Sequence, residues 1–557
     1  MMGATFDSTK VLFYGVILVV GLFLTLFVLL PLADILLKSF QDASGAWVWL
    51  DNFYYYLSQS HSRMLIKNSL FVAGLSTLIV IPVAFTFAYA ITRTLMPLKP
   101  VIRYIALIPL LAPSLLPAIS FIYIFGNQGF LKSWMGGGSI YGVWGVIMGE
   151  CFYVFPHALM ILITALGLSD ARLYEAAQSM GAGKFKQFMS ITLPSAKYGL
   201  ISAMLVTFTL VITDFGVPKV IGGDFGLLAT EIYKQVIGQQ NFELGATVGV
   251  LLLIPSVITF AVDALIQKKQ RASLSAKSVA YRPKKWALRD LGMLGFTLVV
   301  CALLVGILGV AVYASFVKFW PYNLDLVLSH YNFDMMDGGG WNSYYNSLKL
   351  ATLVAVFGTM IVFVSAYVVE RSKVARPAIA AIKMLALLPM AVPGLVLGLG
   401  YIFFFNHPDN PLGFMYQTLS ILVVCTIAHF FTPSFITATT TLKQIDREFE
   451  DVGESMSVPF YITFFRVTVP ISVPSIIEIT RYFFVNAMTT VSAVVFLYSP
   501  DTTLAAVAVL NMDEAGDISA AAAMATLIVA TSFVATMGFA LLSRGVVKAT
   551  QSWRIGR

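Results

Sequence analysis

The sequence predicts an all-α, polytopic membrane protein with about twelve transmembrane helices in two parallel six-span repeats. Hydrophobic residues make up 58% of the 557 residues and charged residues only 11%, whereas a soluble domain carries about 25% charged residues. Residues 11–33 contain no charge and can cross about 30 Å of hydrocarbon. This run is longer than the core of a cleavable signal peptide, roughly 7–15 residues, so we expect it to be retained as the first span.

Apolar stretches of span length recur through the whole chain. In the first half they fall near residues 11–37, 66–92, 102–126, 141–168, 197–217 and 243–267. In the second half they fall near residues 291–317, 345–370, 380–405, 417–441, 473–497 and 518–544. Because each half has six of them, both halves enter and leave the membrane on the same side, which defines parallel repeats.

Matches at a nearly constant spacing indicate that the halves arose by tandem duplication. Three residues of the second span recur 278 positions later, namely Ala88, Tyr89 and Arg93 as Ala366, Tyr367 and Arg371. Residues 164–180 align with residues 440–456 at an offset of 276. Collinear matches of this kind predict a first repeat at 1–267, a linker at 268–290 and a second repeat at 291–557.

The distribution of basic residues predicts the orientation. Loops 93–103 and 371–383 are basic, whereas loops 406–416 and 498–517 contain no lysine or arginine. The linker is also basic, with Lys268, Lys269, Arg271, Lys277, Arg282, Lys284, Lys285 and Arg289. The positive-inside rule places the linker and both termini in the cytoplasm. This rule also accounts for the net charge of +8 without a nucleic-acid partner, and the linker composition predicts a flexible tether.

The polar stretch EAAQSMGAGKFKQFMSITLP, residues 175–194, interrupts the apolar pattern between the fourth and fifth spans. It is not a P-loop, because Phe185 stands where that motif requires Ser or Thr after Gly-Lys. Ser169 and Asp170 are candidate helix caps, and Gly181 permits the positive φ that ends a helix. We therefore expect a short helical hairpin that stops at Pro194. From the physics alone, an ordinary amphipathic loop helix on the bilayer surface is the favoured interpretation.

This stretch resembles the cytoplasmic EAA loop of permease subunits in binding-protein-dependent ABC importers. The family pattern is Glu-Ala-Ala, three residues, Gly, nine residues, and Ile-x-Leu-Pro. It is matched here by Glu175, Ala176, Ala177, Gly181, Ile191, Leu193 and Pro194. The resemblance implies that loop 169–197 docks on an ATPase subunit and transmits the closure of that subunit to the transport pathway.

The second copy of this motif is degenerate. At the offset of 276, the four ATPase-coupling positions are occupied by Asp451, Val452, Gly453 and Ser457. A carboxylate and the closing Pro470 remain, but the hinge glycine is lost. The resemblance therefore leaves open whether loop 446–472 binds its ATPase as tightly as the first loop does.

Three ionisable residues within the predicted spans are candidates for the substrate pathway. Asp214 lies near the outer end of the fifth span, and Glu478 and Arg481 lie in its counterpart in the second half. A charge at mid-membrane costs roughly 2.5–3.5 kcal/mol, so each one requires a reason. Glu478 and Arg481 are spaced i, i+3 and can also simply neutralise each other. No spacing typical of a metal site is present.

The resemblance to fused two-repeat permeases implies a transport component of the bacterial inner membrane and not an enzyme. It implies no cofactor in this chain, since ATP and Mg are bound by the partner ATPase. The implied partners are two ATP-binding cassette subunits, a periplasmic solute-binding protein and the lipid bilayer. Residues 213–242 look most like permeases assigned to 2-aminoethylphosphonate, so a phosphonate is the expected substrate.

Ferric iron or thiamine is the alternative substrate, since relatives with this layout serve both. A free ferric ion would need clustered oxygen ligands, and the sequence shows no such cluster. A secondary transporter or channel is the rival class of function. It would need its own path of buried carboxylates for a coupling ion, and the few scattered acidic residues disfavour it.

Overall fold

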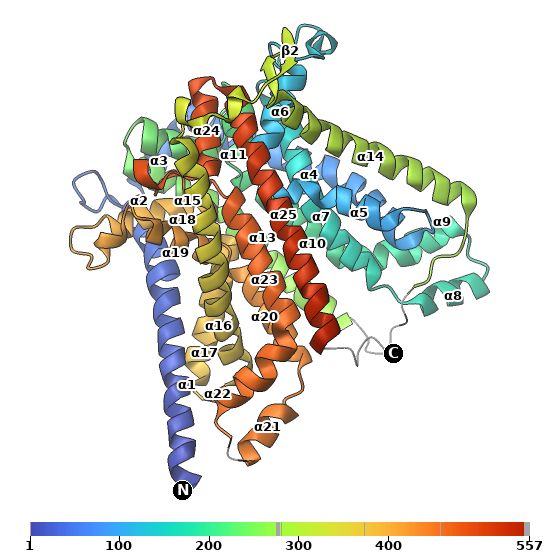
Figure 1. Ribbon diagram of the computed structural model, residues 1–557, viewed down its shortest axis with the longest axis vertical. Coiled ribbons are helices and arrows are strands. Elements are labelled where there is room, and N and C mark those ends of the chain that lie inside the picture. The colour runs from blue at the N-terminus through green and yellow to red at the C-terminus, as the bar shows by residue number, and fades with distance from the viewer. Residues whose placement is uncertain (1, 274–278, 280, 373, 457, 551–557) are drawn as a thin grey trace. The chain divides into compact units, whose positions relative to one another are not determined.

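A computed structural model describes residues 2–273, 279, 281–372, 374–456 and 458–550 (Figure 1). In this part of the chain nine helices are long and apolar enough to cross a membrane, and three bent helix pairs bring the number to twelve if each pair is one span. The predicted all-α polytopic fold is thus confirmed, and each of the twelve expected apolar stretches contains a helix, although the stretch at 473–497 is helical only up to Thr489. Within the same residues, the one β-structure with named strands is an antiparallel hairpin of β1 (Val317–Phe319) and β2 (Asn323–Leu326).

The described chain divides into two compact units that differ from the sequence repeats. Unit 2 covers Leu50–Asn332 and Met512–Thr526, and unit 1 covers the chain up to Trp49, Phe333–Asn511 and the residues from Leu527 onward. The first helix of each repeat thus belongs to the unit built mainly from the other repeat. The repeat boundaries at 267 and 291 are boundaries of sequence similarity and stay a prediction.

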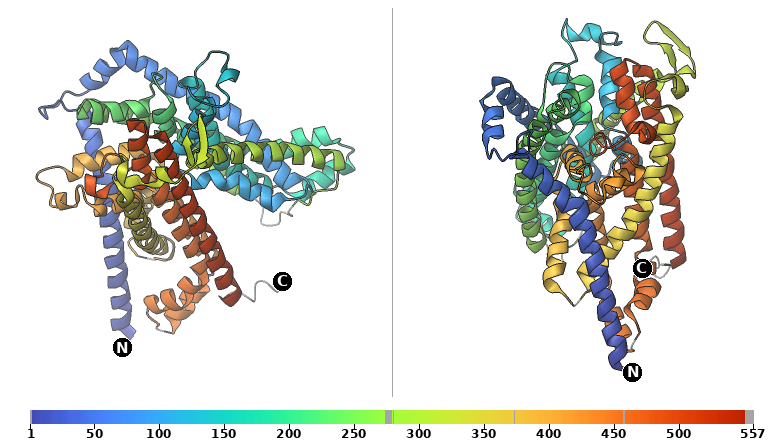
Figure 2. Two further views of the ribbon diagram at one scale, coloured as in Figure 1. Left: turned by 45° about the horizontal axis from the view of Figure 1, so that its top comes forward. Right: turned by 90° about the vertical axis from the view of Figure 1, so that its left-hand side faces the viewer.

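Unit 2 is built around three helices that pack on one another, α4 (Ser60–Arg93), α7 (Val143–Gly167) and α10 (Leu193–Thr213). The long helix α14 (Ala287–Ala314) lies beside α5 (Lys99–Leu107) and α6 (Leu115–Phe125) (Figure 2). The remaining helices are α3 (Asp51–Ser58), α8 (Ala171–Ser179), α9 (Lys184–Gln187), α11 (Gly216–Ile221), α12 (Leu228–Tyr233) and α13 (Phe242–Ser273).

Unit 1 repeats this arrangement with the equivalent helices. Helix α16 (Thr359–Arg371) packs on α20 (Phe431–Gln444) and α23 (Val469–Thr489), and α1 (Met2–Leu24) packs on α16 and α17 (Arg376–Leu387). The other helices are α2 (Leu30–Ser39), α15 (Gly340–Leu353), α18 (Gly394–Phe405), α19 (Leu419–His429), α21 (Glu448–Ser455) and α22 (Phe460–Thr463). Helices α24 (Ala505–Ala515) and α25 (Ile518–Thr550) contribute residues to both units.

The third span of each repeat is sharply broken, and a proline explains each break. Residues 99–111 and 115–125 meet at 100°, and residues 376–391 and 394–405 meet at 117°. Ala112 and Val392 adopt extended backbone angles at these points. Each of them precedes a proline, whose ring excludes the α conformation of the residue before it.

Candidate functional site: the two EAA loops

The first EAA loop, residues 169–197, begins with a capped helix. Of the two predicted caps the structure uses Asp170, whose side chain accepts a hydrogen bond from the backbone N–H of Arg172 at 3.1 Å. This bond stabilises the carboxylate and lowers the pKa of Asp170. Helix α8 then runs only nine residues, Ala171–Ser179.

Gly181 ends α8 with the positive φ that the sequence predicts, +75°. Its N–H donates to the carbonyl of Gln178 at 3.0 Å, and the N–H of Ala182 donates to the carbonyl of Ala177 at 2.9 Å. These two bonds form a Schellman motif, in which a left-handed residue closes the helix and satisfies its last carbonyls.

The predicted stop at Pro194 is wrong, because the second helical stretch continues into the membrane. Residues 184–213 form one continuous helix that passes through a π-turn, η4 (Phe188–Thr192). Within that turn the N–H of Leu193 donates to the carbonyl of Phe188, five residues back. The wider turn ends just before Pro194, which lacks an N–H. The same device recurs at η11 (Phe464–Thr468) before Pro470.

In the second EAA loop, residues 446–472, the structure shows a similar helix ending. Helix α21 is followed by a bond from the N–H of Val458 to the carbonyl of Gly453 at 2.8 Å, the counterpart of the Ala182–Ala177 bond. Ser457 lies outside the described residues. A Cβ at Gly453 would approach Thr463 Oγ1 to 2.8 Å, so glycine here permits close packing of α21 against α22.

The predicted coupling residues lie on an accessible surface. Glu175, Ala176 and Gly181 are exposed and Ala177 is half-buried. Their second-loop counterparts Asp451 and Val452 are exposed, whereas Gly453 is buried.

Both loops also expose large apolar side chains, and these occupy equivalent positions. The first loop exposes Leu173, Met180, Phe185 and Met189, and the second loop exposes Phe449, Met456, Tyr461 and Phe465. Each of these four pairs is related by the repeat offset of 276. The exposed fraction is 86% for Met180 and 65% for its counterpart Met456. We call these two sets the apolar faces of the EAA loops. The i, i+7 spacing of Leu173 and Met180 places these two on one helix face in the sequence, whereas the polar motif gives no indication of the other six residues.

The described part of the linker after residue 278 contacts the first EAA loop, whereas residues 274–278 and 280 lie outside the described residues, so the flexible tether stays a prediction. Ala171 donates its N–H to the carbonyl of Val279 at 2.8 Å, and Val279 donates its N–H to Asp170 Oδ1 at 3.3 Å. Lys284 Nζ donates to Gln178 Oε1 at 2.9 Å. Val279, Tyr281 and Lys284 therefore contact successive parts of α8.

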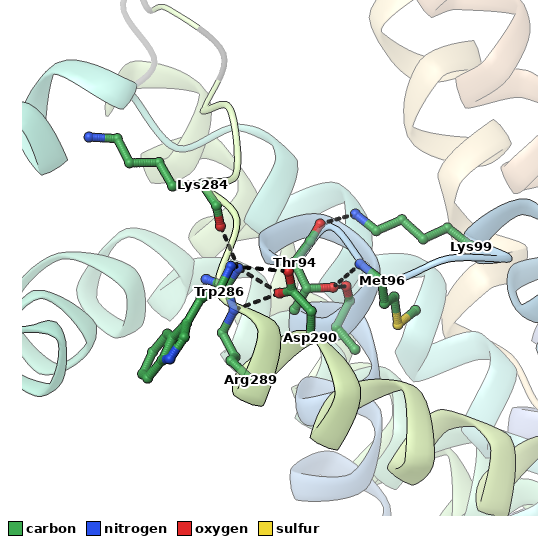
Figure 3. A network of polar contacts seen from close by, with 8 residues as sticks. Thr94, Met96, Lys99, Lys284, Trp286, Arg289 and Asp290 are labelled. Carbon is green, nitrogen blue, oxygen red and sulfur yellow. Dashed lines mark hydrogen bonds and ion pairs between the residues drawn. The ribbon is translucent and has the colours of Figure 1, made fainter.

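A polar network holds the end of the linker (Figure 3). Arg289 pairs with Asp290 at 2.7 Å and donates to the carbonyl of Lys284 at 2.8 Å. The N–H of Trp286 donates to the other carboxylate oxygen of Asp290 at 3.3 Å. In the same view Lys99 donates to the carbonyl of Thr94, in the loop that follows α4. Composition alone could not predict the contacts of Val279 and Lys284 with the first EAA loop, because they depend on which loop lies beside the linker.

The three candidate pathway residues lie apart from the EAA loops. Asp214 ends α10 and accepts a hydrogen bond from the N–H of Val217 at 2.9 Å. Glu478 and Arg481 form the ion pair that their spacing predicts, with a bond of 3.1 Å from Arg481 Nε to Glu478 Oε2. Among the described residues no group of three or more His, Cys, Asp or Glu side chains could hold a metal ion.

Comparisons with known proteins agree with this architecture. The model of the family described as "Binding-protein-dependent transport system inner membrane component" matches residues 80–272 and, a second time, residues 372–548. The chain is 27% identical over 531 residues to the "Ferric transport system permease protein FbpB" of Actinobacillus pleuropneumoniae, covering 92% of this chain and 76% of that protein.

Two further relatives differ in length. The "Putative ferric transport system permease protein FbpB 1" of Haemophilus influenzae is 28% identical over 462 residues, which cover 80% of this chain and 72% of the relative. The "Spermidine/putrescine transport system permease protein PotB" of Escherichia coli is 26% identical over 253 residues, which cover 43% of this chain and 91% of the relative. A single-repeat permease thus corresponds to about half of this chain.

Members of the matched family are transport components and not catalysts, and they carry no cofactor. ATP is bound by a partner ATPase, and a binding protein is the other implied partner. The family model matches more than half of the residues, once in each repeat. The chain therefore belongs to the binding-protein-dependent transport system inner membrane components, as a fused, multi-pass permease subunit of an ABC importer.

Proposed function

We propose that this chain forms the membrane pathway of an ATP-driven importer for ferric iron, and that one ATPase subunit binds at each of its two EAA loops. The apolar faces are the observation that carries the coupling part of this proposal. Each face combines side chains of the α8 or α21 segment with side chains at the start of the long helix that continues as the fifth span of its repeat. A partner that covers such a face gains the free energy of burying apolar surface, and it can then move the attached helices.

The substrate part of the proposal rests on the relatives. The two relatives that match most of this chain are both named for ferric transport. The comparisons give the phosphonate prediction no support and favour its ferric alternative.

The proposed orientation places both EAA loops and both termini in the cytoplasm, where ATP is available. The basic linker contacts the first EAA loop, so both lie on the same side of the membrane. The positive-inside rule assigns that side to the cytoplasm. A solute-binding protein then delivers its cargo to the opposite face.

Reconstitution tests this function. Proteoliposomes containing this chain and its ATPase should take up iron from binding protein incubated with radiolabelled ferric citrate, and the uptake should require ATP and be blocked by vanadate. Inhibition of this uptake by excess 2-aminoethylphosphonate or thiamine, and not by excess unlabelled ferric citrate, would refute the substrate assignment. Uptake that resists vanadate and collapses with an ionophore would instead favour a secondary transporter.

Charge reversal tests whether the two loops bind the ATPase unequally. Glu175→Arg removes the carboxylate of the complete motif, whereas Asp451→Arg removes that of the degenerate copy. Because both residues are exposed, neither change should disturb folding. We expect Glu175→Arg to weaken ATPase capture more than Asp451→Arg does, measured by pull-down of the detergent-purified complex. Equal losses would show that the loops contribute equally.

A further inference from the structure

A buried arginine stands at the end of the second span in each repeat. Arg93 ends α4 and Arg371 ends α16. Arg93 is 3% exposed, and Arg371 is half-buried as a residue but has a buried side chain, 4% exposed. The two arginines are related by the offset of 278, and in the sequence they serve only as markers of the repeat. A buried guanidinium is unfavourable unless its charge and its N–H groups find partners, so their partners indicate what they do.

Each arginine first contacts the end of the fourth span. Arg93 Nη2 donates to the carbonyl of Leu166 at 2.7 Å, and Arg371 Nη2 donates to the carbonyl of Leu442 at 2.7 Å. Leu166 and Leu442 are themselves equivalent, at the repeat offset of 276. A cation that bonds the last carbonyls of a helix also compensates the helix dipole, and this contact alone would be a structural cap.

Each arginine also contacts the short helix of its EAA loop, again at an equivalent position. The guanidinium of Arg93 lies over the ring of Tyr174, 5.3 Å from its centre. Arg371 Nη1 lies 3.3 Å from Glu450 Oε2. Tyr174 and Glu450 are related by the same offset of 276, so the contact is kept although its chemistry changes from cation–π to an ion pair.

The linker completes the contact in the first repeat only. Tyr281 places its ring 4.4 Å from the Arg93 guanidinium and 4.5 Å from the ring of Tyr174. Tyr174 is anchored further by a 2.9 Å hydrogen bond between its hydroxyl and Thr192 Oγ1. In the second repeat Arg371 instead donates a second bond, to the carbonyl of Ile445 at 2.8 Å.

We propose that Arg93 and Arg371 are positioning residues that carry the movement of each EAA-loop helix to the second span of its repeat. The planar guanidinium has five N–H donors and a stacking face, so one side chain can join the second span, the fourth-span end and the EAA loop. Displacing α8 or α21 therefore displaces the end of α4 or α16. This inference rests on the proposed binding of an ATPase at the EAA loops.

The first repeat allows a test that does not depend on the solute. Leu95 is 51% exposed and lies two residues beyond Arg93, so an environment-sensitive fluorophore on Leu95→Cys reports movement at the end of α4. Cys301 and Cys425 are buried and Cys151 is half-buried, so the same chain without Leu95→Cys measures background labelling. The labelled chain, in complex with its ATPase, is then mixed with ATP.

We expect ATP to change the fluorescence of the labelled parent, and Arg93→Gln or Tyr174→Ala to reduce that change at least fivefold while the ATPase is still captured. Tyr174→Phe keeps the ring and should retain at least half of the response. Arg103→Gln, an exposed arginine beyond the same loop, is the matched control and should behave like the parent.

Four results would overturn the inference. A full response in Arg93→Gln would show that Arg93 is only a structural cap. Loss of the response in Tyr174→Phe as well as in Tyr174→Ala would show that stacking is not the contact that matters. A parent chain that captures no ATPase would refute the proposed function together with the inference, whereas a parent that captures ATPase and responds equally in every variant would refute the inference alone.

Discussion

Glutamate at both Leu173 and Met180 is expected to abolish capture of the ATPase at the first EAA loop, weakening binding at least about 100-fold. Both side chains are largely exposed in the free chain and would be buried by a docked partner. Apolar anchors at an interface contribute about 2 kcal/mol or more each, and every 1.4 kcal/mol changes affinity tenfold. Glutamate would in addition place unpaired charges in the interface.

The chain offers matched controls for this experiment. Phe449 and Met456 are the equivalent pair in the second EAA loop, and their replacement by glutamate should weaken capture there. Trp134→Glu removes an aromatic side chain that is 79% exposed in the loop after α6, and should leave capture unchanged. Affinity can be measured by titrating labelled ATPase onto the chain in nanodiscs. Full affinity in the Leu173, Met180 double variant would exclude the first apolar face as the docking surface.

Replacing Gly199 by valine is expected to destabilise unit 2 by about 3 kcal/mol, the upper end of the usual cost of overpacking. Even a Cβ at Gly199 would lie 2.1 Å from the Cβ of Ala165. Gly199 lies near the start of α10 and Ala165 near the end of α7, on either side of the first EAA loop. Small residues let membrane helices approach this closely, and a larger one must separate the helices that carry the loop.

The second repeat makes the same contact with different chemistry and so supplies the control. Thr441 and Ser475 occupy the equivalent positions, and Thr441 Oγ1 donates to Ser475 Oγ at 2.7 Å. Ser475→Ala loses one hydrogen bond and should cost only about 0.5–1.5 kcal/mol. Thermal unfolding of the purified chain, together with ATP-dependent uptake, measures both variants. A Gly199→Val chain with unchanged unfolding temperature and uptake would show that the close approach is not needed.

The apolar runs predicted the helices well, since burial in lipid leaves few alternatives for a charge-free stretch of span length. The motif from Glu175 to Gly181 likewise predicted the helix and its left-handed ending, because only local backbone conformation is involved. The stop at Pro194 was wrong because a proline marks a missing N–H, and a π-turn can accommodate that gap within a continuous helix.

Other features depend on tertiary contacts that no local pattern specifies. The apolar sequences of α1 and α14 do not indicate which of the two units each helix packs in. The role of Arg93 depends on Tyr174 and Tyr281, which are distant in sequence and meet only in the fold. The apolar faces could have been found from the sequence, because their four residue pairs share the offset of 276 already used to align the repeats.

Uptake of ferric iron into proteoliposomes, with and without the ATPase subunits, tests most directly whether a separate motor drives this chain through its EAA loops. We predict ATP-dependent uptake by the complete complex, and loss of that uptake both when the ATPase is omitted and when Leu173 and Met180 are replaced by glutamate. Uptake at the full rate by the chain alone, or by the double variant, would contradict the account.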